Sequence, residues 1–357
     1  MVSNVAGLIR KPGDLVAIEA VDQWVPAEGE LLVRVEAVNF NPIDAKLQRS
    51  DLFQSKYPLV VGFTFAGTVI STGRGVESVQ SGDRVVVARW GQTGADHRFG
   101  ALQRYALALE QNTLRLELES TTLEAATGLI ANLATVVSAL SIHMGLAKPP
   151  LNSSGGLLRP SNPDEDARRK RVLVYGGSSA VGGLAVQYAA AAGYEVVTTA
   201  SPANRPLVEA RMAATHIIDH HQSRESLLDE IRTHGPYDGG IFEAIGSQTT
   251  TQLMADLLRD TGGQFFSTSP SPGDDRLPTN VTKMWSGYSE DLVSTPENRE
   301  SRAWFMERFL PRVLKDGTIW PNPGLWLPGG LRSAQRALDL LHEGRISGKK
   351  ILINPQE

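Results

Sequence analysis

The chain has 357 residues, no cysteine and a formal net charge of −4. The missing cysteines exclude disulfides, thiolate nucleophiles, iron–sulfur clusters and cysteine-ligated zinc. No basic excess points to nucleic acid or an anionic membrane. At roughly 150 residues per domain, the length indicates about two domains. Because the N-terminus lacks the apolar core of a secretory signal and no apolar run reaches about 18 residues, we expect a cytoplasmic protein without a membrane partner.

Residues 30–82 are rich in predicted strands. LLVRVEAV alternates apolar and polar residues, and YPLVVGFTFAGTVISTG and GDRVVVARW follow as glycine-punctuated runs, which together resemble a partly open antiparallel barrel. Residues 123–140 change to helical spacing. Residues 145–171 are rich in Pro, Ser, Gly and charge and predict a surface loop. Its basic end, Arg168 to Arg171, is either a solvated approach to the next strand or a docking patch for an acidic partner.

Residues 172–193 predict a strand, a tight turn and a helix in succession. The first four form an apolar run that is typical of a parallel strand buried on both faces. In the turn no side chain exceeds valine, so its backbone can approach a pyrophosphate at the helix N-terminus. A strict G-x-G-x-x-G is absent because serine occupies the middle position, and an ordinary turn of another α/β protein is the alternative. The candidate dinucleotide-binding residues are Gly176, Gly177, Ser178, Ser179, Ala180, Val181 and Gly182.

From residue 195 onward the sequence predicts alternating strands and helices, which indicates a doubly wound sheet. A last apolar run, KKILIN, is expected to return to the first domain as a strand. The predicted strands are 195–200, 216–220, 239–246 and 264–269, and the predicted helices lie near 206–213, 226–233, 250–260, 300–315 and 331–343.

Several motifs occur in the order of one known family. They are the N-P-x-D segment (Asn41, Pro42, Asp44) followed by Lys46, then VGFTFAGTV, SGDRVVV, FGALQRYAL, VLVYGGSSAVG and the ending ISGKKILI. On these residues the chain resembles the medium-chain dehydrogenase/reductase superfamily, in its zinc-free quinone oxidoreductase branch, and is most similar to fungal trans-acting enoyl reductases of polyketide biosynthesis. The resemblance implies an α/β fold in which a Rossmann-type doubly wound parallel sheet, 136–299, is inserted in a GroES-like partly open β-barrel catalytic domain, 1–135 and 300–357.

The resemblance also implies NADPH, and the residues after the second strand of the sheet agree with it. An NAD site needs an acidic residue there, whereas this chain has Thr199, Ala200 and Ser201. Asn204 and Arg205 follow, and an unopposed arginine beside hydroxyl and amide donors suits a 2′-phosphate. The alternative is that Arg205 only caps a surface helix.

Two histidines lie near the predicted third strand of the sheet. His220 lies where relatives carry a tyrosine against the 2′-phosphate, so it is a further candidate contact. His216 and His220 are four residues apart, but they lie across a predicted strand with no third ligand nearby, and we therefore expect no metal.

The expected chemistry follows from ligands that are missing. Zinc alcohol dehydrogenases place a cysteine and a histidine in the segments that here read NFNPIDAK and VGFTF. Without them, conjugate reduction is favoured, because hydrogen-bond donors alone stabilise the charge that spreads to the carbonyl oxygen. The resemblance gives Asn41, Lys46 and Thr135 as candidate catalytic donors. Alternatively, Asn41 is a turn residue and Lys46 an exposed lysine.

The remaining candidates also come from the resemblance. Phe63, Lys283 and Trp285 are expected to bind substrate, with core packing as the alternative for both aromatic residues. The residues at the ends of the strands are expected to flank the nicotinamide. They are Ala244, Ile245, Gly246, Ser267 and Thr268.

The expected activity is NADPH-dependent reduction of an activated carbon–carbon double bond in a small-molecule or carrier-protein-bound acyl substrate, with a polyketide synthase as the expected partner. Two alternatives stay open: an NADPH quinone reductase, and an NADPH-binding accessory or non-redox protein on the same fold. The chain is expected to be a monomer or a homodimer.

Overall fold

The computed structural model describes residues 3–50, 56–91, 93, 96–117, 120–151, 170–211, 213–270 and 276–357. Residues 152–169, which include Arg168, Arg169 and most of the predicted surface loop, lie outside the described part. The chain divides into two compact units. The first, here called the barrel unit, comprises Met1–Ala131 and Pro323–Glu357, and the second, here called the sheet unit, comprises Asn132–Asn322.

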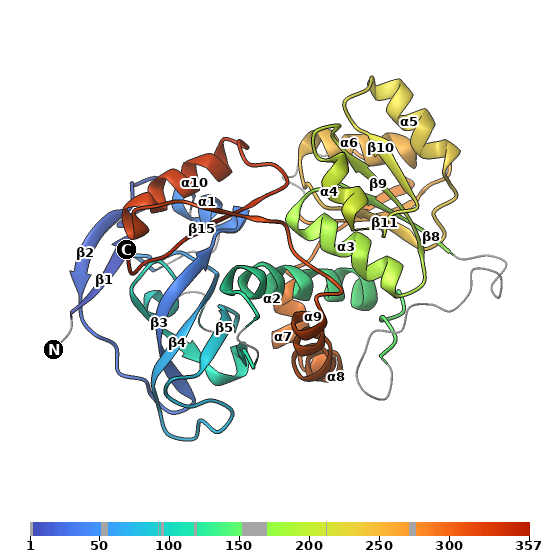
Figure 1. Ribbon diagram of the computed structural model, residues 1–357. Helices are drawn as coiled ribbons and strands as arrows, with labels where there is room; N and C mark the ends of the chain where they lie inside the picture. Colours follow the sequence, from blue (N-terminus) through green and yellow to red (C-terminus); the bar gives the residue numbers. More distant parts are fainter. Residues whose placement is uncertain are drawn as a thin grey trace. The chain divides into compact units, whose positions relative to one another are not determined.

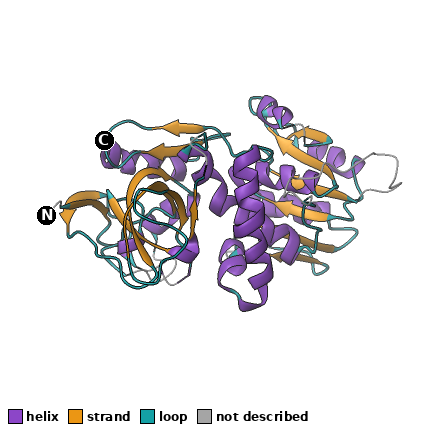
Figure 2. Ribbon diagram, turned by 60° about the horizontal axis from the view of Figure 1, so that its bottom comes forward, coloured by secondary structure: helices purple, strands orange, loops and turns teal. Residues whose placement is uncertain are grey.

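Strand β3 (Glu30–Asn39) organises the barrel unit. It pairs antiparallel with β4 on one side, with β6 along its first half and with β15 at its end, and it changes register twice against β4. Such bulges bend a strand, and Figure 2 shows the strands of this unit curling round one another. The predicted partly open barrel and the returning C-terminal strand are both confirmed. The other strands are β1 (Asn4–Leu8), β2 (Ala17–Val21), β4 (Thr64–Thr72), β5 (Arg84–Ala88), β6 (Tyr105–Leu109), β7 (Thr113–Arg115), β14 (Gly324–Trp326) and β15 (Lys350–Ile353).

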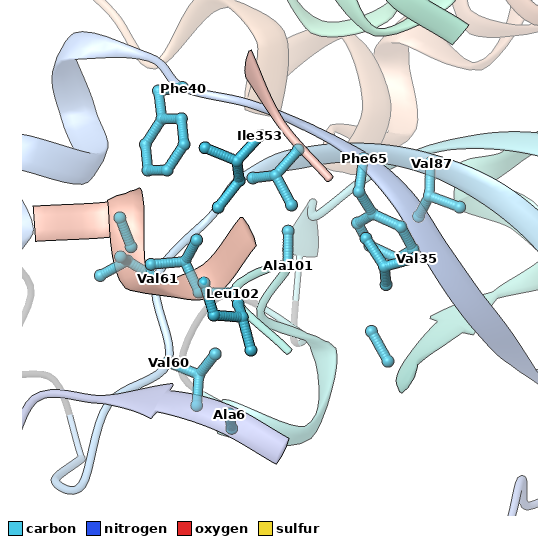
Figure 3. Packing of buried hydrophobic residues seen from close by; sticks show 14 of the residues in the cluster. Ala6, Val35, Phe40, Val60, Val61, Phe65, Val87, Ala101, Leu102 and Ile353 are labelled. Carbon is cyan, nitrogen blue, oxygen red and sulfur yellow. The ribbon is translucent and has the colours of Figure 1, made fainter. Parts of the chain in front are cut away.

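The core of the barrel unit is aliphatic and aromatic. Figure 3 shows Val35, Phe65 and Val87, from three neighbouring strands, lying together, and all three are at most 2% exposed. Each such side chain contributes about 1.5–3 kcal/mol through burial. Helices α1 (Pro42–Arg49) and α10 (Ala334–His342) pack against each other beside this core (Figure 1). Short 3₁₀ turns cover His97–Phe99, Glu110–Asn112 and Gly330–Ser333.

The sheet unit contains six parallel strands in the order β10-β9-β8-β11-β12-β13. This is the doubly wound order 3-2-1-4-5-6, in which the connection reverses between β8 and β11. The expected Rossmann-type sheet is confirmed, with one strand, β13, that the sequence pattern did not predict. The strands are β8 (Arg171–Tyr175), β9 (Glu195–Ala200), β10 (His216–Asp219), β11 (Gly240–Glu243), β12 (Gly263–Ser267) and β13 (Val281–Met284).

Helices cover both faces of this sheet. Leu173 and Ile241 pack with apolar side chains of α5 and α6, while Val172 and Val174, which point the other way, are also fully buried. Helix α3 contacts β8 and β9. Figure 1 shows these helices gathered around the strands. Their bounds are α3 (Ala180–Ala191), α4 (Arg205–Ala210), α5 (Arg224–Thr233) and α6 (Gln248–Leu257).

The segment 300–322 belongs to the sheet unit. The boundary therefore lies after Asn322, not after residue 299 as expected. The physical reason is packing on α3. The ring of Phe309 lies edge-on to that of Tyr188, with their centroids 5.6 Å apart, and the backbone N–H and carbonyl of Trp320 both form hydrogen bonds with the side-chain amide of Gln187. The helices outside the sheet are α2 (Leu123–Val137), α7 (Tyr288–Ser294), α8 (Arg299–Ala303) and α9 (Leu310–Asp316), with π-helical turns at Ser138–His143 and Trp304–Phe309 and a 3₁₀ turn at Pro296–Asn298.

One helical stretch in the described part of the chain, Leu123–His143, has the length and composition of a membrane span. Its apolar window is 78% buried inside the protein, and the core helices of globular proteins have the same composition.

Candidate functional site

The turn between β8 and α3 is held tightly against β9. The N–H of Gly176 donates to the hydroxyl of Thr199 and the N–H of Gly177 to its carbonyl, both at 2.9 Å. A Cβ on Gly177 would lie 2.2 Å from Oγ1 of Thr198, and Gly176 has a φ of +93°. The close approach of this turn to the neighbouring strand therefore requires glycine at both positions.

Ser179, at the position of the missing middle glycine, caps helix α3. Its Oγ accepts a hydrogen bond of 3.0 Å from the N–H of Gly182. A Cβ on Gly182 would lie 2.2 Å from the carbonyl oxygen of Gly176, so glycine is required here as well. A serine here lacks the backbone freedom of a glycine, but its side chain caps the helix, and this hydrogen bond stabilises the start of α3.

Three backbone N–H groups of the turn are left over. Those of Ser178, Ala180 and Val181 have no hydrogen-bond partner among the described residues, and all three residues are half-buried. The first N–H groups of a helix carry the positive end of its dipole and bind anions well. The turn thus fits a pyrophosphate by an observation independent of its glycine spacing.

At the end of β9 no acidic residue follows the strand. Ser201 accepts from the N–H groups of Asn204 and Arg205 through its carbonyl, at 3.0 and 2.9 Å. Arg205 is half-exposed, and it is not unopposed as expected: its Nε donates to Glu209 at 2.8 Å and its Nη1 to the carbonyl of Ile217 at 3.0 Å. The i, i+4 spacing on α4 brings the carboxylate within reach. Such exposed pairs are weak, so Glu209 competes only modestly for the guanidinium.

The histidines occupy the edge of the sheet. His220 is half-buried and stands edge-on to His221 at 4.6 Å, and burial, then His221, lower its pKa. At neutral pH it is therefore a neutral ring that can donate one N–H. His216 stacks on His234 at 4.2 Å. No group of three or more metal-ligating side chains occurs among the described residues, and the expectation of no metal stays a prediction.

Glu243, which the sequence reasoning missed, fixes the adjoining strand ends. This fully buried carboxylate accepts from the N–H groups of Ile245 and Gly246, both at 2.8 Å, and from the hydroxyl of Ser267 at 2.8 Å. The backbone N–H of Thr268 donates to its carbonyl at 3.1 Å. A charged residue ending the buried run GIFE was the signal that could have identified it. Ala244 to Gly246 are thereby tied to the end of β12.

Two predicted substrate residues, Trp285 and Lys283, differ in how they are held. Trp285 is 45% exposed, close to Met284 at 37%, so its ring is not part of a closed core. The ammonium of Lys283 donates to Thr251 Oγ1 at 2.9 Å. Trp285 is therefore accessible to a ligand, while Lys283 is held to α6.

The predicted donors lie in different units. Asn41 and Lys46 belong to α1 of the barrel unit, Lys46 being exposed, and the half-buried Thr135 belongs to α2 in the sheet unit. Phe63 is half-buried, and its carbonyl accepts from the N–H of Arg89 at 2.8 Å.

A buried polar cluster holds the N-terminus of α1. The carboxylate of Asp44 accepts from the N–H groups of Asn41 and Gly62, at 2.8 and 3.0 Å. Lys350, on β15, donates to Oδ1 of Asn41 at 2.7 Å and to the carbonyl of Phe40 at 2.8 Å. Because an ammonium only donates, the amide oxygen of Asn41 faces Lys350.

The other end of the Asn41 amide is also held. Its nitrogen lies 3.3 Å from the carbonyl of Asn39 and 3.4 Å from Oγ1 of Thr64, and the residue is 7% exposed. Burial raises the pKa of Asp44 to about 6 and lowers that of Lys350 to about 8. The structure therefore places Asn41 in a polar cluster that stabilises the barrel unit, and its donor role stays a prediction.

The buried carboxyl of Asp44 makes stability pH-dependent. The pKa of Asp44 is about 6 in the folded protein and 3.8 as a free side chain. The stabilisation of the folded state that comes from protonating this carboxyl is therefore fully present below about pH 4 and is lost as the pH rises through 6. Relative to Asp44→Asn, the free energy of unfolding of the natural protein should fall by about 2 kcal/mol between these limits. Urea unfolding of both proteins from pH 4 to 7.5 measures this difference, and a constant difference would contradict it.

The cap on α3 gives a second prediction. Ser179→Ala should lower the free energy of unfolding by about 1 kcal/mol, because the N–H of Gly182 loses its acceptor. Ser178→Ala, one residue earlier, is the matched control and should change it by less than about 0.5 kcal/mol. Denaturant titration of the two variants compares them, and equal losses would show that the cap contributes nothing specific.

Residues 27–118 match the alcohol dehydrogenase GroES-like domain. A trans-enoyl reductase of Aspergillus japonicus is 29% identical over 327 residues, covering 91% of this chain and 89% of that protein.

Among solved structures, an alcohol dehydrogenase superfamily protein of Novosphingobium aromaticivorans aligns with a TM-score of 0.72 at 20% identity, covering 98% of this chain and 99% of that one. A mycobacterial protein in complex with NADPH aligns with a TM-score of 0.72 at 21% identity, covering 99% of this chain and 100% of that one. At these identities the two structures establish the shared fold.

Proposed function

We propose that this chain, which belongs to the medium-chain dehydrogenase/reductase superfamily of oxidoreductases, reduces an activated carbon–carbon double bond with NADPH. The observation that carries the proposal is the turn at 176–182, with its three unpartnered N–H groups, in a chain that is similar over nine-tenths of its length to a trans-enoyl reductase. The substrate class is an enoyl thioester or an enone.

The chain's residues fit a dinucleotide in three places. The N–H groups of Ser178, Ala180 and Val181 would hold the pyrophosphate, and Ser201, Asn204 and Arg205 would bind the 2′-phosphate, with His220 as a neutral donor. The tied strand ends, 244–246 with Ser267 and Thr268, would flank the nicotinamide. When bound, NADPH would supply the hydride that adds to the β-carbon of the double bond, and a proton from solvent would complete the reduction at the α-carbon.

The protein must stabilise the negative charge that spreads to the substrate carbonyl oxygen. Fixed hydrogen-bond donors do this with little reorganisation. Of the three candidates, Asn41 has both ends of its side-chain amide engaged by the buried polar cluster at the start of α1. We therefore assign to Asn41 the positioning of α1, and the donor role of Lys46 and of Thr135 is carried by the family resemblance alone.

The activity is tested by NADPH oxidation with enoyl thioesters, free and carrier-protein-bound, and with enones and quinones. We expect turnover of the enoyl substrates and stereospecific transfer from 4-deuterated NADPH to the β-carbon. A preference for the carrier-bound thioester would support a synthase partner, and turnover of quinones alone would establish the quinone reductase alternative. If NADPH binds and no substrate class is reduced, the proposed activity is wrong and a non-redox role is favoured.

The 2′-phosphate assignment has its own test. Arg205→Ala should raise the Kd for NADPH about tenfold and leave that for NADH within about twofold, because only NADPH carries the phosphate. Glu209→Gln, which frees the guanidinium from its carboxylate partner, should leave NADPH binding equal or tighter. Fluorescence titration measures each Kd. Equal losses of both cofactors in Arg205→Ala would contradict the assignment.

A further inference from the structure

Arg211, at the end of α4, is a buried cation beside the dinucleotide turn. It is 7% exposed, and no carboxylate in the described part of the chain forms an ion pair with it. Burial lowers its pKa to about 10, so it remains charged at neutral pH. Its Nε is buried without a partner. Burying an uncompensated charge is costly, which makes a nearby site for an anion the natural complement.

Its other contacts are to the turn and to one neighbouring segment. Nη1 donates to the carbonyl of Gly177 at 3.2 Å, and Nη2 donates to the amide oxygen of Asn322. The guanidinium carbon lies 5.3 Å from the centre of the Trp320 ring, a cation–π distance. Asn322 in turn donates to the carbonyl of Ser178 at 2.9 Å. Two consecutive carbonyls of the turn are thus held by one connected pair of side chains.

The contact of Arg211 determines where the N–H of Ser178 points. In a planar trans peptide the carbonyl and the N–H point in opposite directions. Since Arg211 holds the carbonyl of Gly177, the N–H of Ser178 in the same peptide faces away from the guanidinium, and it is one of the three without a partner. The N–H of Ser179, in the next peptide, donates to Gly176 at 2.9 Å.

The chain leaves space for this arginine. A Cβ on Gly183 would lie 1.7 Å from Nη1 of Arg211, so the guanidinium occupies the place of a side chain on α3. The segment that carries Trp320 and Asn322 is anchored on the same helix through Gln187, whose amide bonds both the N–H and the carbonyl of Trp320 at 3.0 Å.

We propose that Arg211 and Asn322 are positioning residues of the cofactor site. They hold the carbonyls of Gly177 and Ser178, which fixes the turn with the N–H of Ser178 directed to the pyrophosphate of a nicotinamide dinucleotide, and Arg211 adds a buried positive charge behind the turn. The inference rests on the proposed dinucleotide site. Since the pyrophosphate is common to NADPH and NADH, the affinities for both cofactors should depend equally on Arg211 and Asn322. In contrast, only the affinity for NADPH should depend on Arg205.

The test compares the Kd for NADPH and for NADH by calorimetry. Arg211→Met should weaken both about 10- to 100-fold, as expected for loss of a hydrogen bond from a charged group. Arg211→Lys, which keeps the charge, should recover part of the loss. Gly183→Ala should displace the guanidinium and weaken the binding of both cofactors by a similar factor. Adding Arg211→Met to this variant should raise the Kd values little further, because the two changes remove the same interaction.

The matched control is Arg232→Met, on α5 of the same unit. Arg232 is exposed and pairs with Asp229 at 3.3 Å, so its loss should leave both Kd values unchanged. A purely structural role for Arg211 would lower Tm and leave the Kd measured well below Tm unchanged, and that result overturns the inference. Loss of NADPH binding without loss of NADH binding also overturns it.

The outcomes separate this inference from the proposed function. Natural protein that binds neither cofactor overturns both. Natural protein that binds them while Arg211→Met and Gly183→Ala bind equally well overturns the inference alone. Binding without reduction of any acyl substrate overturns the proposed activity, while the measured affinities still decide the role of Arg211.

Discussion

The structure of the sheet unit depends on how closely the turn after β8 approaches β9. Thr199 accepts from Gly176 and Gly177, and a Cβ on Gly177 or Gly182 would lie 2.2 Å from a neighbouring oxygen. This constraint fixes the course of the backbone through the turn. The N–H groups of Ser178, Ala180 and Val181 are then the donors without a partner among the described residues at the start of α3, and such donors are what an anion site requires.

Buried polar groups are used differently in the two units. In the barrel unit, Asp44, Lys350 and Asn41 satisfy one another and fix α1 to β15. In the sheet unit, Glu243 is fully satisfied by backbone N–H groups and Ser267, whereas Arg211 retains an unpartnered Nε and no carboxylate partner among the described residues. A satisfied cluster stabilises a fold, and an incompletely satisfied charge beside free donors indicates a ligand.

Local sequence predicted the elements well where periodicity and turn chemistry agree. The strand, turn and helix at 172–193, five strands of the parallel sheet and the returning strand β15 follow from apolar runs and glycines. The short strand β13 was missed because VTKM carries no clear period. The boundary after Asn322 could not be derived, since it depends on contacts of Phe309 and Trp320 with α3, more than a hundred residues earlier. Arg211 could not be identified for a similar reason, since its partners Gly177 and Asn322 are distant in sequence. The pair of Arg205 with Glu209, in contrast, is a local i, i+4 contact that the predicted helix over this segment could have indicated.

We propose that the dinucleotide pyrophosphate binds to the unpartnered N–H groups of the turn at Ser178, Ala180 and Val181. The most direct measurement is a crystal structure of the protein with NADPH. We expect phosphate oxygens about 2.7–3.2 Å from the backbone nitrogens of Ser178, Ala180 and Val181, with Arg211 still bonded to the carbonyl of Gly177. Phosphates bound elsewhere, with these three N–H groups facing solvent, would contradict it.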